Sequence, residues 1–145
     1  MQDKGYCIFY TDDDVDDQLI FKEVVAEIDK SHDLYIQNDG QELLDRLQNP
    51  PPKPQLVFLD LNMPRKNGIQ ALKEIRQSEK LKDITVIIFT TSDDNASIEI
   101  TKDLGASVFI TKPSFFHSFK KAIAHCLSTD WQSKSTDNQF VLSFN

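Results

Sequence analysis

The sequence predicts an α/β fold with a doubly wound, five-stranded parallel sheet in the strand order 2-1-3-4-5. Short, continuous apolar runs alternate five times with segments whose apolar residues recur at helical spacing. This pattern is typical of parallel strands that are covered by helices on both faces. Right-handed crossovers leave few possible topologies for such a chain, and this order is a common one. The length of 145 residues suits one domain with a single core.

The first half of the chain holds three of the expected strands and two of the expected helices. In order, these are a strand at Tyr6–Thr11, a helix at Asp16–Lys30, a strand at Leu34–Gln37, a helix at Gln41–Leu47 and a strand at Leu56–Leu61. The first helix carries acids near its start, where they interact favourably with the helix dipole. The turn sequence Asn38-Asp39-Gly40 ends the second strand, and the proline-rich segment Asn49–Pro54 is expected to be a stiff loop.

The second half continues the same alternation. In order, we expect a helix at Ile69–Ser78, a strand at Ile84–Thr90, a helix at Asn95–Leu104, a strand at Ala106–Thr111 and a helix running to about Leu127. The run ITVIIFT is rich in β-branched residues and is the most β-prone segment of the chain. Gly105 fits the C-terminal cap of one helix, and Ser114 is expected to cap the start of the last helix.

Composition argues against several functional classes. The net charge of −7 is unlike that of a nucleic-acid-binding surface, which needs clustered Lys and Arg. No apolar stretch approaches the roughly 20 residues that span a bilayer. The N-terminal sequence MQDKGYCIFY lacks the basic and apolar segments of a signal peptide. We therefore expect a cytoplasmic protein that binds neither nucleic acid nor a membrane.

The candidate site lies beyond the carboxyl ends of the strands, where ligands bind in doubly wound sheets. Asp12 and Asp13 follow the first strand, and Asp60 lies at the end of the third strand, which is its neighbour in the predicted order. Three adjacent carboxylates cannot all stay ionised without a counter-charge. Mg²⁺ prefers oxygen ligands and often binds one or two carboxylates together with a phosphate. The sequence therefore predicts a magnesium site, whereas Asp14, Asp16 and Asp17 are expected to be solvated acids of a helix start.

Two further side chains are expected at the same edge of the sheet. Thr90 ends the fourth strand, and Lys112 follows the fifth. The hydroxyl can donate a hydrogen bond to a phosphoryl oxygen, and the ammonium can neutralise one or pair with Asp60 when no phosphate is bound. A carboxylate beside a metal, a lysine and a hydroxyl suits nucleophilic phosphoryl transfer that forms an acyl phosphate.

At this point the sequence resembles a known family, the response-regulator receiver domains of two-component signalling, which have a flavodoxin-like fold. The matching motifs are Asp12-Asp13 after the first strand, LDLNMPRKNG (Leu59–Gly68), Thr90 at the end of IIFT, and Lys112-Pro113 after GASVFIT. The spacing also resembles that of the family, with 30 residues from Asp60 to Thr90 and 22 from Thr90 to Lys112. The resemblance covers about residues 5 to 127, nearly the whole folded part.

The resemblance implies a role for each matching residue. Asp60 would accept phosphate from a histidine kinase or a histidine phosphotransfer protein. Asp13, Asp60 and the backbone carbonyl of Asn62 would hold Mg²⁺, with Asp12 acting through water. Thr90 and Lys112 would bind the phosphoryl oxygens.

The resemblance also implies a conformational switch. In the family, the threonine moves toward the phosphate while an aromatic residue of the fifth strand turns inward. Here that residue is Phe109, where a tyrosine is frequent, so its switch would depend on packing without a hydroxyl. The Lys112-Pro113 peptide is commonly cis in the family, which would aim the lysine into the site.

Three other functional classes fit the sequence less well than phosphoryl acceptance. Haloacid-dehalogenase-like phosphatases need a second aspartate two residues after the first, and that position is Asn62 here, so we do not expect a turnover enzyme. A nucleotide-binding P-loop is absent from the sequence. Flavin binding shares the topology, but the acid pair would repel the flavin phosphate. A receiver-like protein-interaction module that is never phosphorylated stays open as the alternative.

The chain is expected to divide into a receiver domain at residues 1–127 and a tail at residues 128–145. Such a tail is too short for a DNA-binding or enzymatic domain, so we expect a stand-alone receiver that acts through protein contacts, as an effector or a relay, with a homodimer possible. Phe140, Leu142 and Phe144 alternate with other residues in a strand-like pattern. This pattern predicts that Gln139–Phe144 docks on the domain or extends a sheet edge of the same or another chain, the alternative being a disordered tail.

Overall fold

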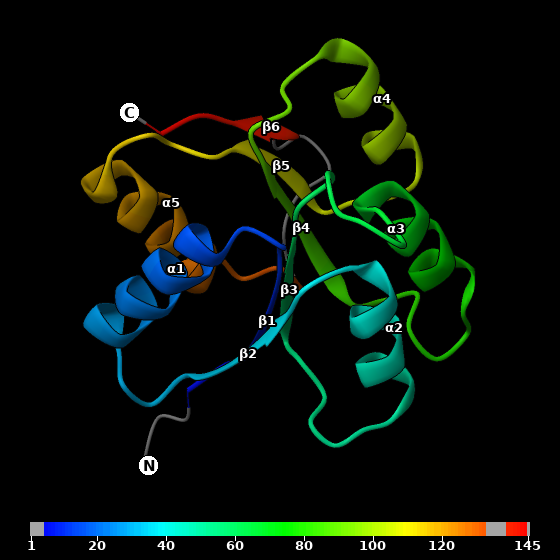
Figure 1. Ribbon diagram of the computed structural model, residues 1–145, viewed down its shortest axis with the longest axis horizontal. Coiled ribbons are helices and arrows are strands. Elements are labelled where there is room, and N and C mark those ends of the chain that lie inside the picture. The colour runs from blue at the N-terminus through cyan, green and yellow to red at the C-terminus, as the bar shows by residue number, and fades with distance from the viewer. Residues whose placement is uncertain (1–4, 133–138, 145) are drawn as a thin grey trace.

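A computed structural model describes residues 5–132 and 139–144 as a three-layer α/β fold with the sheet in the middle (Figure 1). The strands are β1 (Cys7–Thr11), β2 (Asp33–Gln37), β3 (Leu56–Leu59), β4 (Thr85–Thr90), β5 (Val108–Thr111) and β6 (Val141–Leu142). The helices are α1 (Val15–Ile28), α2 (Gly40–Gln48), α3 (Gly68–Gln77), α4 (Asn95–Asp103) and α5 (Phe116–Ser128). No helix in these described ranges has the length and apolar character needed to cross a membrane.

The sheet confirms the predicted order and extends it by one strand. Its order is β2-β1-β3-β4-β5-β6, and every neighbouring pair is parallel. The tail segment therefore does form a strand, beside β5, with Phe109 opposite Val141 and Ile110 opposite Leu142. Residues 133–138 and 145 of the predicted tail lie outside the described residues, and the boundary between domain and tail stays a prediction.

Two apolar layers hold the helices on the sheet. Helices α1 and α5 cover one face, and α2, α3 and α4 cover the other (Figure 1). The layer under α1 and α5 contains a cluster of five aromatic rings, those of Tyr10, Phe21, Phe58, Phe89 and Phe119. Strands β1, β3, β4 and β5 are almost fully buried because both of their faces are covered, which explains their continuous apolar sequences.

Local capping explains most of the helix ends. Asp14 caps α1 by accepting a hydrogen bond from the Asp17 amide, and Asn67 forms a capping box with Gln70 at the start of α3. Gly105 follows α4 with φ of 92°, as its predicted capping role requires. The prediction for Ser114 is wrong, because α5 begins at Phe116 and its N-cap, Phe115, makes no side-chain capping bond. Ser114 lies one residue too early in the chain to reach the free amides of the first turn.

The connection to β6 has the opposite hand from the others. The β1-α1-β2 crossover steps toward one edge of the sheet with α1 on one face, and β5-α5-β6 steps toward the other edge with α5 on that same face. The crossovers through α2, α3 and α4 also step toward the β6 edge, but on the opposite face, and so share the hand of β1-α1-β2. Because about 98% of such crossovers are right-handed, the β5-α5-β6 connection has the rare left hand.

Candidate functional site

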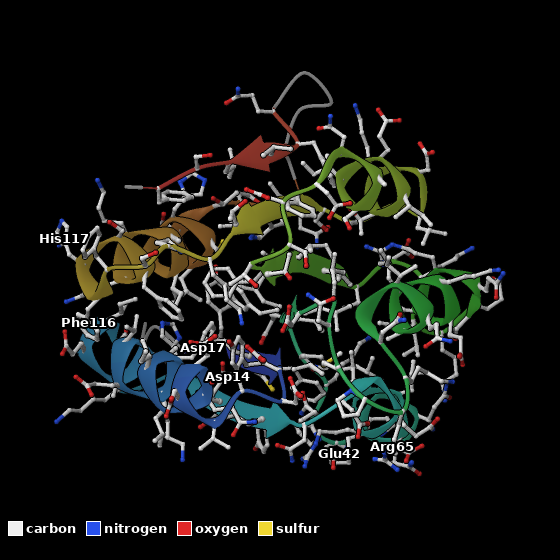
Figure 2. All side chains as sticks on the ribbon, turned by 45° about the horizontal axis from the view of Figure 1, so that its top comes forward. Asp14, Asp17, Glu42, Arg65, Phe116 and His117 are labelled. Carbon is white, nitrogen blue, oxygen red and sulfur yellow. The ribbon has the colours of Figure 1, made fainter. Side chains whose placement is uncertain are left out.

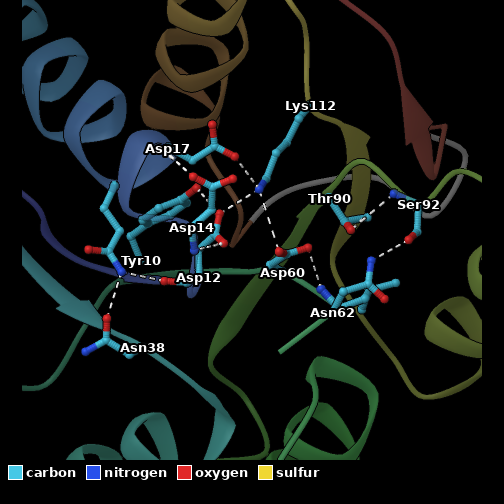
Figure 3. A network of polar contacts seen from close by, with 12 residues as sticks. Tyr10, Asp12, Asp14, Asp17, Asn38, Asp60, Asn62, Thr90, Ser92 and Lys112 are labelled. Carbon is cyan, nitrogen blue, oxygen red and sulfur yellow. Dashed lines mark hydrogen bonds and ion pairs between the residues drawn. The ribbon is translucent and has the colours of Figure 1, made fainter. Parts of the chain in front are cut away.

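The backbone hydrogen bonds of the sheet continue one residue past the strands and fix the positions of the candidate residues, whose side chains are drawn in Figure 3. The amide of Asp12 donates to the Gln37 carbonyl at 3.0 Å, and the amide of Asp60 donates to the Thr11 carbonyl at 3.0 Å. The amide of Lys112 donates to the Thr90 carbonyl at 2.8 Å. The parallel register therefore brings the residues after β1, β3 and β5 to one edge of the sheet.

Three of the predicted carboxylates converge at this edge. Ligand oxygens of Asp12, Asp13 and Asp60 lie within 4.8 Å of one another. Asp12 and Asp60 are buried, whereas Asp13 is exposed, so the cluster opens to solvent on one side. Oxygen donors at this separation fit a hard divalent cation such as Mg²⁺, which keeps several waters. Whether the Asn62 carbonyl joins them stays a prediction; the Asn62 side chain donates to the Ser92 hydroxyl at 2.5 Å.

Lys112 lies among the carboxylates, as predicted. Its Nζ atom is 2.6 Å from Asp12 Oδ2, 2.7 Å from Asp17 Oδ2 and 3.6 Å from Asp60 Oδ2. Burial alone would lower the pKa of the Lys112 ammonium, but the hydrogen bonds to Asp12 and Asp17 outweigh it and raise the pKa. Lys112 is therefore a permanent cation, and it already stands within reach of a group added to Asp60.

Two members of the site were not predicted from the sequence. Asp17, expected to be solvated, lies on the first turn of α1 (Figure 2) and pairs with Lys112 (Figure 3), whereas Asp14 and Asp16 are exposed as expected. The buried hydroxyl of Tyr10 donates to Asp12 Oδ2 at 2.5 Å. Burial, followed by the charge of Asp12, raises the pKa of the Tyr10 phenol and keeps it a donor.

The surroundings of Asp60 change the acidity of its carboxyl group. Burial raises the pKa of its carboxyl, while the hydrogen bond of Thr90 and the charge of Lys112 act in the opposite direction. The Leu61 amide donates to Asp60 Oδ1 at 2.8 Å, which orients the carboxylate. Thr90 thus occupies the position beside Asp60 that the sequence assigned to it.

At Gly68, the loop after Asp60 packs tightly against the backbone of Asp60 and Leu61. A Cβ atom added there would lie 2.2 Å from the carbonyl oxygen of Asp60 and 2.9 Å from Leu61 Cα. Both atoms belong to the backbone, so the loop could accept a side chain only by moving Asp60. The glycine is therefore required by a close approach of two backbone segments.

We expect Gly68→Ala to lower the free energy of unfolding by about 1–3 kcal/mol, the usual cost of overpacking, and to slow phosphoryl uptake because Asp60 shifts. Gly105→Ala is the matched control. It strains a residue with φ of 92° far from the site and should cost about 1 kcal/mol without slowing uptake. Urea unfolding and intact-mass kinetics measure the two effects. Equal uptake rates in both variants would contradict the role given to Gly68.

Two predicted features remain, the switch residue Phe109 and the cis Lys112-Pro113 bond. Phe109 is fully buried in β5, and its role as a switch stays a prediction. The prediction of a cis Lys112-Pro113 bond is wrong, since the cis bonds among the described residues are Pro50-Pro51 and Pro51-Pro52. Lys112 reaches Asp12 and Asp17 with the ordinary trans peptide, which an X–Pro bond favours by about 0.5–1 kcal/mol.

Comparison with known proteins identifies the family. The sequence model of the response regulator receiver domain matches residues 8–124. Response regulator Rcp1 of Synechocystis sp. is 33% identical over 110 residues, which cover 72% of this chain and 75% of Rcp1. Other curated relatives are longer, and the matched part spans 44%, 33% and 54% of three of them.

Solved structures agree with this assignment. The Mn²⁺-bound form of response regulator Rcp1 matches with a TM-score of 0.79 and 28% identity, over 90% of this chain and 97% of that one. The phosphorylated cyanobacterial phytochrome response regulator RcpA matches with a TM-score of 0.80 and 28% identity, over 91% and 97% of the two chains. With its sheet order, its acid cluster and its buried lysine, the chain belongs to the response regulator receiver domain family, the phosphoacceptor domains of two-component signalling.

Proposed function

We propose that Asp60 accepts a phosphoryl group from a phosphohistidine of a histidine kinase or a histidine phosphotransfer protein, and that this changes the protein contacts of the chain. The observation that carries the proposal is the position of the Asp60 carboxylate. It lies 3.6 Å from the Lys112 ammonium and within 4.8 Å of oxygens of Asp12 and Asp13. A phosphorylated structure of the relative RcpA supports the same chemistry here.

The proposed step is a nucleophilic displacement. An Asp60 carboxylate oxygen attacks the phosphorus atom, the bond from phosphorus to the donor nitrogen breaks, and that nitrogen keeps the electron pair and takes up a proton. Thr90 and Lys112, both beside Asp60, would offer a hydroxyl and an ammonium to oxygens of the transferred group. Preorganised donors of this kind stabilise the charge of the transferring group.

The acid cluster fits a divalent cation, which we propose is Mg²⁺. Asp12, Asp13 and Asp60 would hold it, together with the backbone carbonyl of Asn62. When bound, the cation would neutralise charge on the phosphoryl oxygens and on the acids themselves. Otherwise the Lys112 ammonium lies within 3.6 Å of three carboxylates, those of Asp12, Asp17 and Asp60, and Asp13 adds a fourth negative charge to the cluster. The Mn²⁺-bound structure of Rcp1 supports a divalent ion at this kind of site.

We further propose that the chain is a signalling switch or relay and not a turnover enzyme, because the acceptor is one of its own residues. Because histidine kinases draw phosphate from ATP, the exchange would take place in the cytoplasm. Its partners would be the phosphodonor and a downstream target protein. The alternative, an interaction module that is never phosphorylated, predicts no phosphoryl uptake.

Phosphorylation by a small-molecule donor tests the proposal. The full chain is incubated with acetyl phosphate and MgCl₂, and intact mass spectrometry should show the gain of one phosphoryl group. The bond should be labile to hydroxylamine, as expected for an acyl phosphate. No gain in mass with either acetyl phosphate or phosphoramidate would favour the unphosphorylated interaction module.

Removal of divalent cations should slow this reaction at least about 100-fold. Charge neutralisation by a metal contributes several kcal/mol, and about 1.4 kcal/mol corresponds to tenfold in rate. The rate is measured by intact mass with EDTA, and again after adding excess MgCl₂ or MnCl₂. Both cations should restore it, because the donors are hard oxygens. An unchanged rate in EDTA would show that the acid cluster has another purpose.

A further inference from the structure

The tail strand β6 covers the edge of the sheet next to the proposed switch residue. The Phe109 amide donates to the Phe140 carbonyl at 2.8 Å, and the rings of these two residues lie 6.3 Å apart. On the other face, Leu142 and Phe144 pack toward the layer under α1 and α5, and the Phe144 ring lies 5.5 Å from the His125 ring. The tail thus touches both faces of the sheet beside β5.

This attachment has the features of a separable segment. The strand consists of two residues, and its apolar side chains are only half-buried. Its left-handed connection is the arrangement that a β-α-β unit rarely adopts. A short, partly exposed strand also lies at the low end of local stability. The tail therefore resembles a ligand seated on a completed domain more than it resembles a sixth integral strand.

The end of the tail also adjoins the loop that carries Lys112. A cavity of about 310 Å³ is lined by Ser143 and Phe144 on the tail side and by Lys112, Pro113 and Ser114 on the other. The segment from Phe109 to Ser114 therefore contacts the tail at its first residue and faces it across this cavity at its last. A group added to Asp60 would attract Lys112, which stands 3.6 Å away, and so would draw this segment toward the site.

We propose that the β5 edge is a strand-docking surface, that the tail at residues 139–144 is its resident occupant, and that phosphorylation of Asp60 loosens the tail so that a partner's extended segment replaces it. The coupling rests on the proposed function, whereas the docking surface itself does not. By linkage, a partner strand that displaces the tail would in turn favour the phosphorylated state.

The tail defines the chemistry of the partner. A vacated β5 edge leaves backbone groups such as the Phe109 amide without a hydrogen bond, and a new extended strand would satisfy them. The tail presents apolar side chains to both faces of the sheet, Phe140 and Val141 toward the layer under α2, α3 and α4, and Leu142 and Phe144 toward the layer under α1 and α5. The partner is therefore an extended peptide segment with aromatic or aliphatic residues on both of its faces.

Hydrogen exchange of the full chain tests the coupling. Beryllofluoride, a phosphoryl mimic, is added with MgCl₂, and fluorine NMR reports whether it binds. When it is bound, the Phe109 amide should exchange at least about 10-fold faster. The Asp33 amide, which donates to the Tyr6 carbonyl at the other edge, should keep its rate. If beryllofluoride binds and the exchange rate of the Phe109 amide does not change, the coupling is overturned. If beryllofluoride does not bind, the result counts against the proposed function, and the coupling falls with it.

A peptide tests the docking surface without any phosphorylation. A fluorescent peptide with the sequence QFVLSFN, residues 139–145, is titrated into the full chain and into the full-length variant Leu142→Asp, whose own tail should detach. The peptide should bind the variant at least about 10-fold more tightly than it binds the wild type. A peptide with serine at the four apolar positions, 140, 141, 142 and 144, is the control. If circular dichroism shows that Leu142→Asp is misfolded, Phe144→Asp is used in its place. Equal binding of the peptide to wild type and variant would overturn the docking surface.

Discussion

Asp60→Asn is expected to abolish phosphoryl uptake while leaving the fold intact. The amide has nearly the shape of the carboxylate but is a far weaker nucleophile, so the intact mass should stay unchanged with acetyl phosphate and Mg²⁺. Lys112 keeps its bonds to Asp12 and Asp17 in the variant, so its charge remains paired. Asp14→Asn is the matched control, because it removes a charge from the same acidic run, caps α1 equally well and should be phosphorylated normally.

The same substitution should stabilise the fold at neutral pH. Burial raises the pKa of Asp60, so the folded protein binds the Asp60 proton more tightly than the unfolded chain does. The ionised carboxylate therefore destabilises the fold at neutral pH. This cost shrinks as the pH falls through the raised pKa of the folded protein, and it is gone below the ordinary aspartate pKa of about 3.9. Thermal unfolding should show a higher Tm for Asp60→Asn at pH 7, with the difference shrinking toward pH 3.5. In the phosphorylation experiment, uptake of a phosphoryl group by Asp60→Asn at the normal rate would assign the acceptor role to another residue.

Phe89→Ala is expected to have the largest effect on stability. The Phe89 side chain is fully buried, and its ring centroid lies 5.1 Å from that of Phe119, 6.0 Å from Phe58 and 6.2 Å from Phe21. Truncation would leave a cavity that joins the sheet, α1 and α5. Substitutions of this kind cost about 3–5 kcal/mol, a large part of the 5–15 kcal/mol that is typical of a whole domain.

Urea unfolding with two comparison variants measures this effect. Phe89→Leu keeps most of the volume and should cost no more than about 1.5 kcal/mol. Phe115→Ala removes a ring that is 75% exposed and should change the free energy of unfolding by less than about 0.5 kcal/mol. A loss below about 1.5 kcal/mol for Phe89→Ala would mean that the aromatic cluster can collapse around the missing ring.

The positions of the strands, and with them most of the site, could be predicted from the sequence. Strands buried on both faces have continuous apolar sequences, so their carboxyl ends are marked by the first charged residues, Asp12, Asp60 and Lys112. Once the strand order is given, the convergence of these residues follows from the parallel register. The four motifs can therefore be placed at one edge of the sheet because each belongs to a strand end.

The unpredicted parts depend on side-chain geometry. Asp17 differs from its solvated neighbour Asp16 only in the direction in which α1 points it, and that direction depends on how the helix packs. Tyr10 lies within an apolar strand, and from the sequence it is expected to be a core residue. The sequence does not show that its hydroxyl reaches the Asp12 carboxylate. The isomer of the Lys112-Pro113 bond is likewise set by tertiary contacts, and the family pattern did not apply here.

The tail strand also bears on how the protein behaves at high concentration. The β5 residues Val108, Phe109 and Ile110 are fully buried, and β6 lies along their outer edge. A flat apolar edge left open is a template for strand pairing between molecules, which proteins avoid with a short, partly polar edge strand. With only two paired residues and an exposed serine at position 143, β6 meets that description. The same segment would then keep neighbouring molecules from aggregating through their sheets.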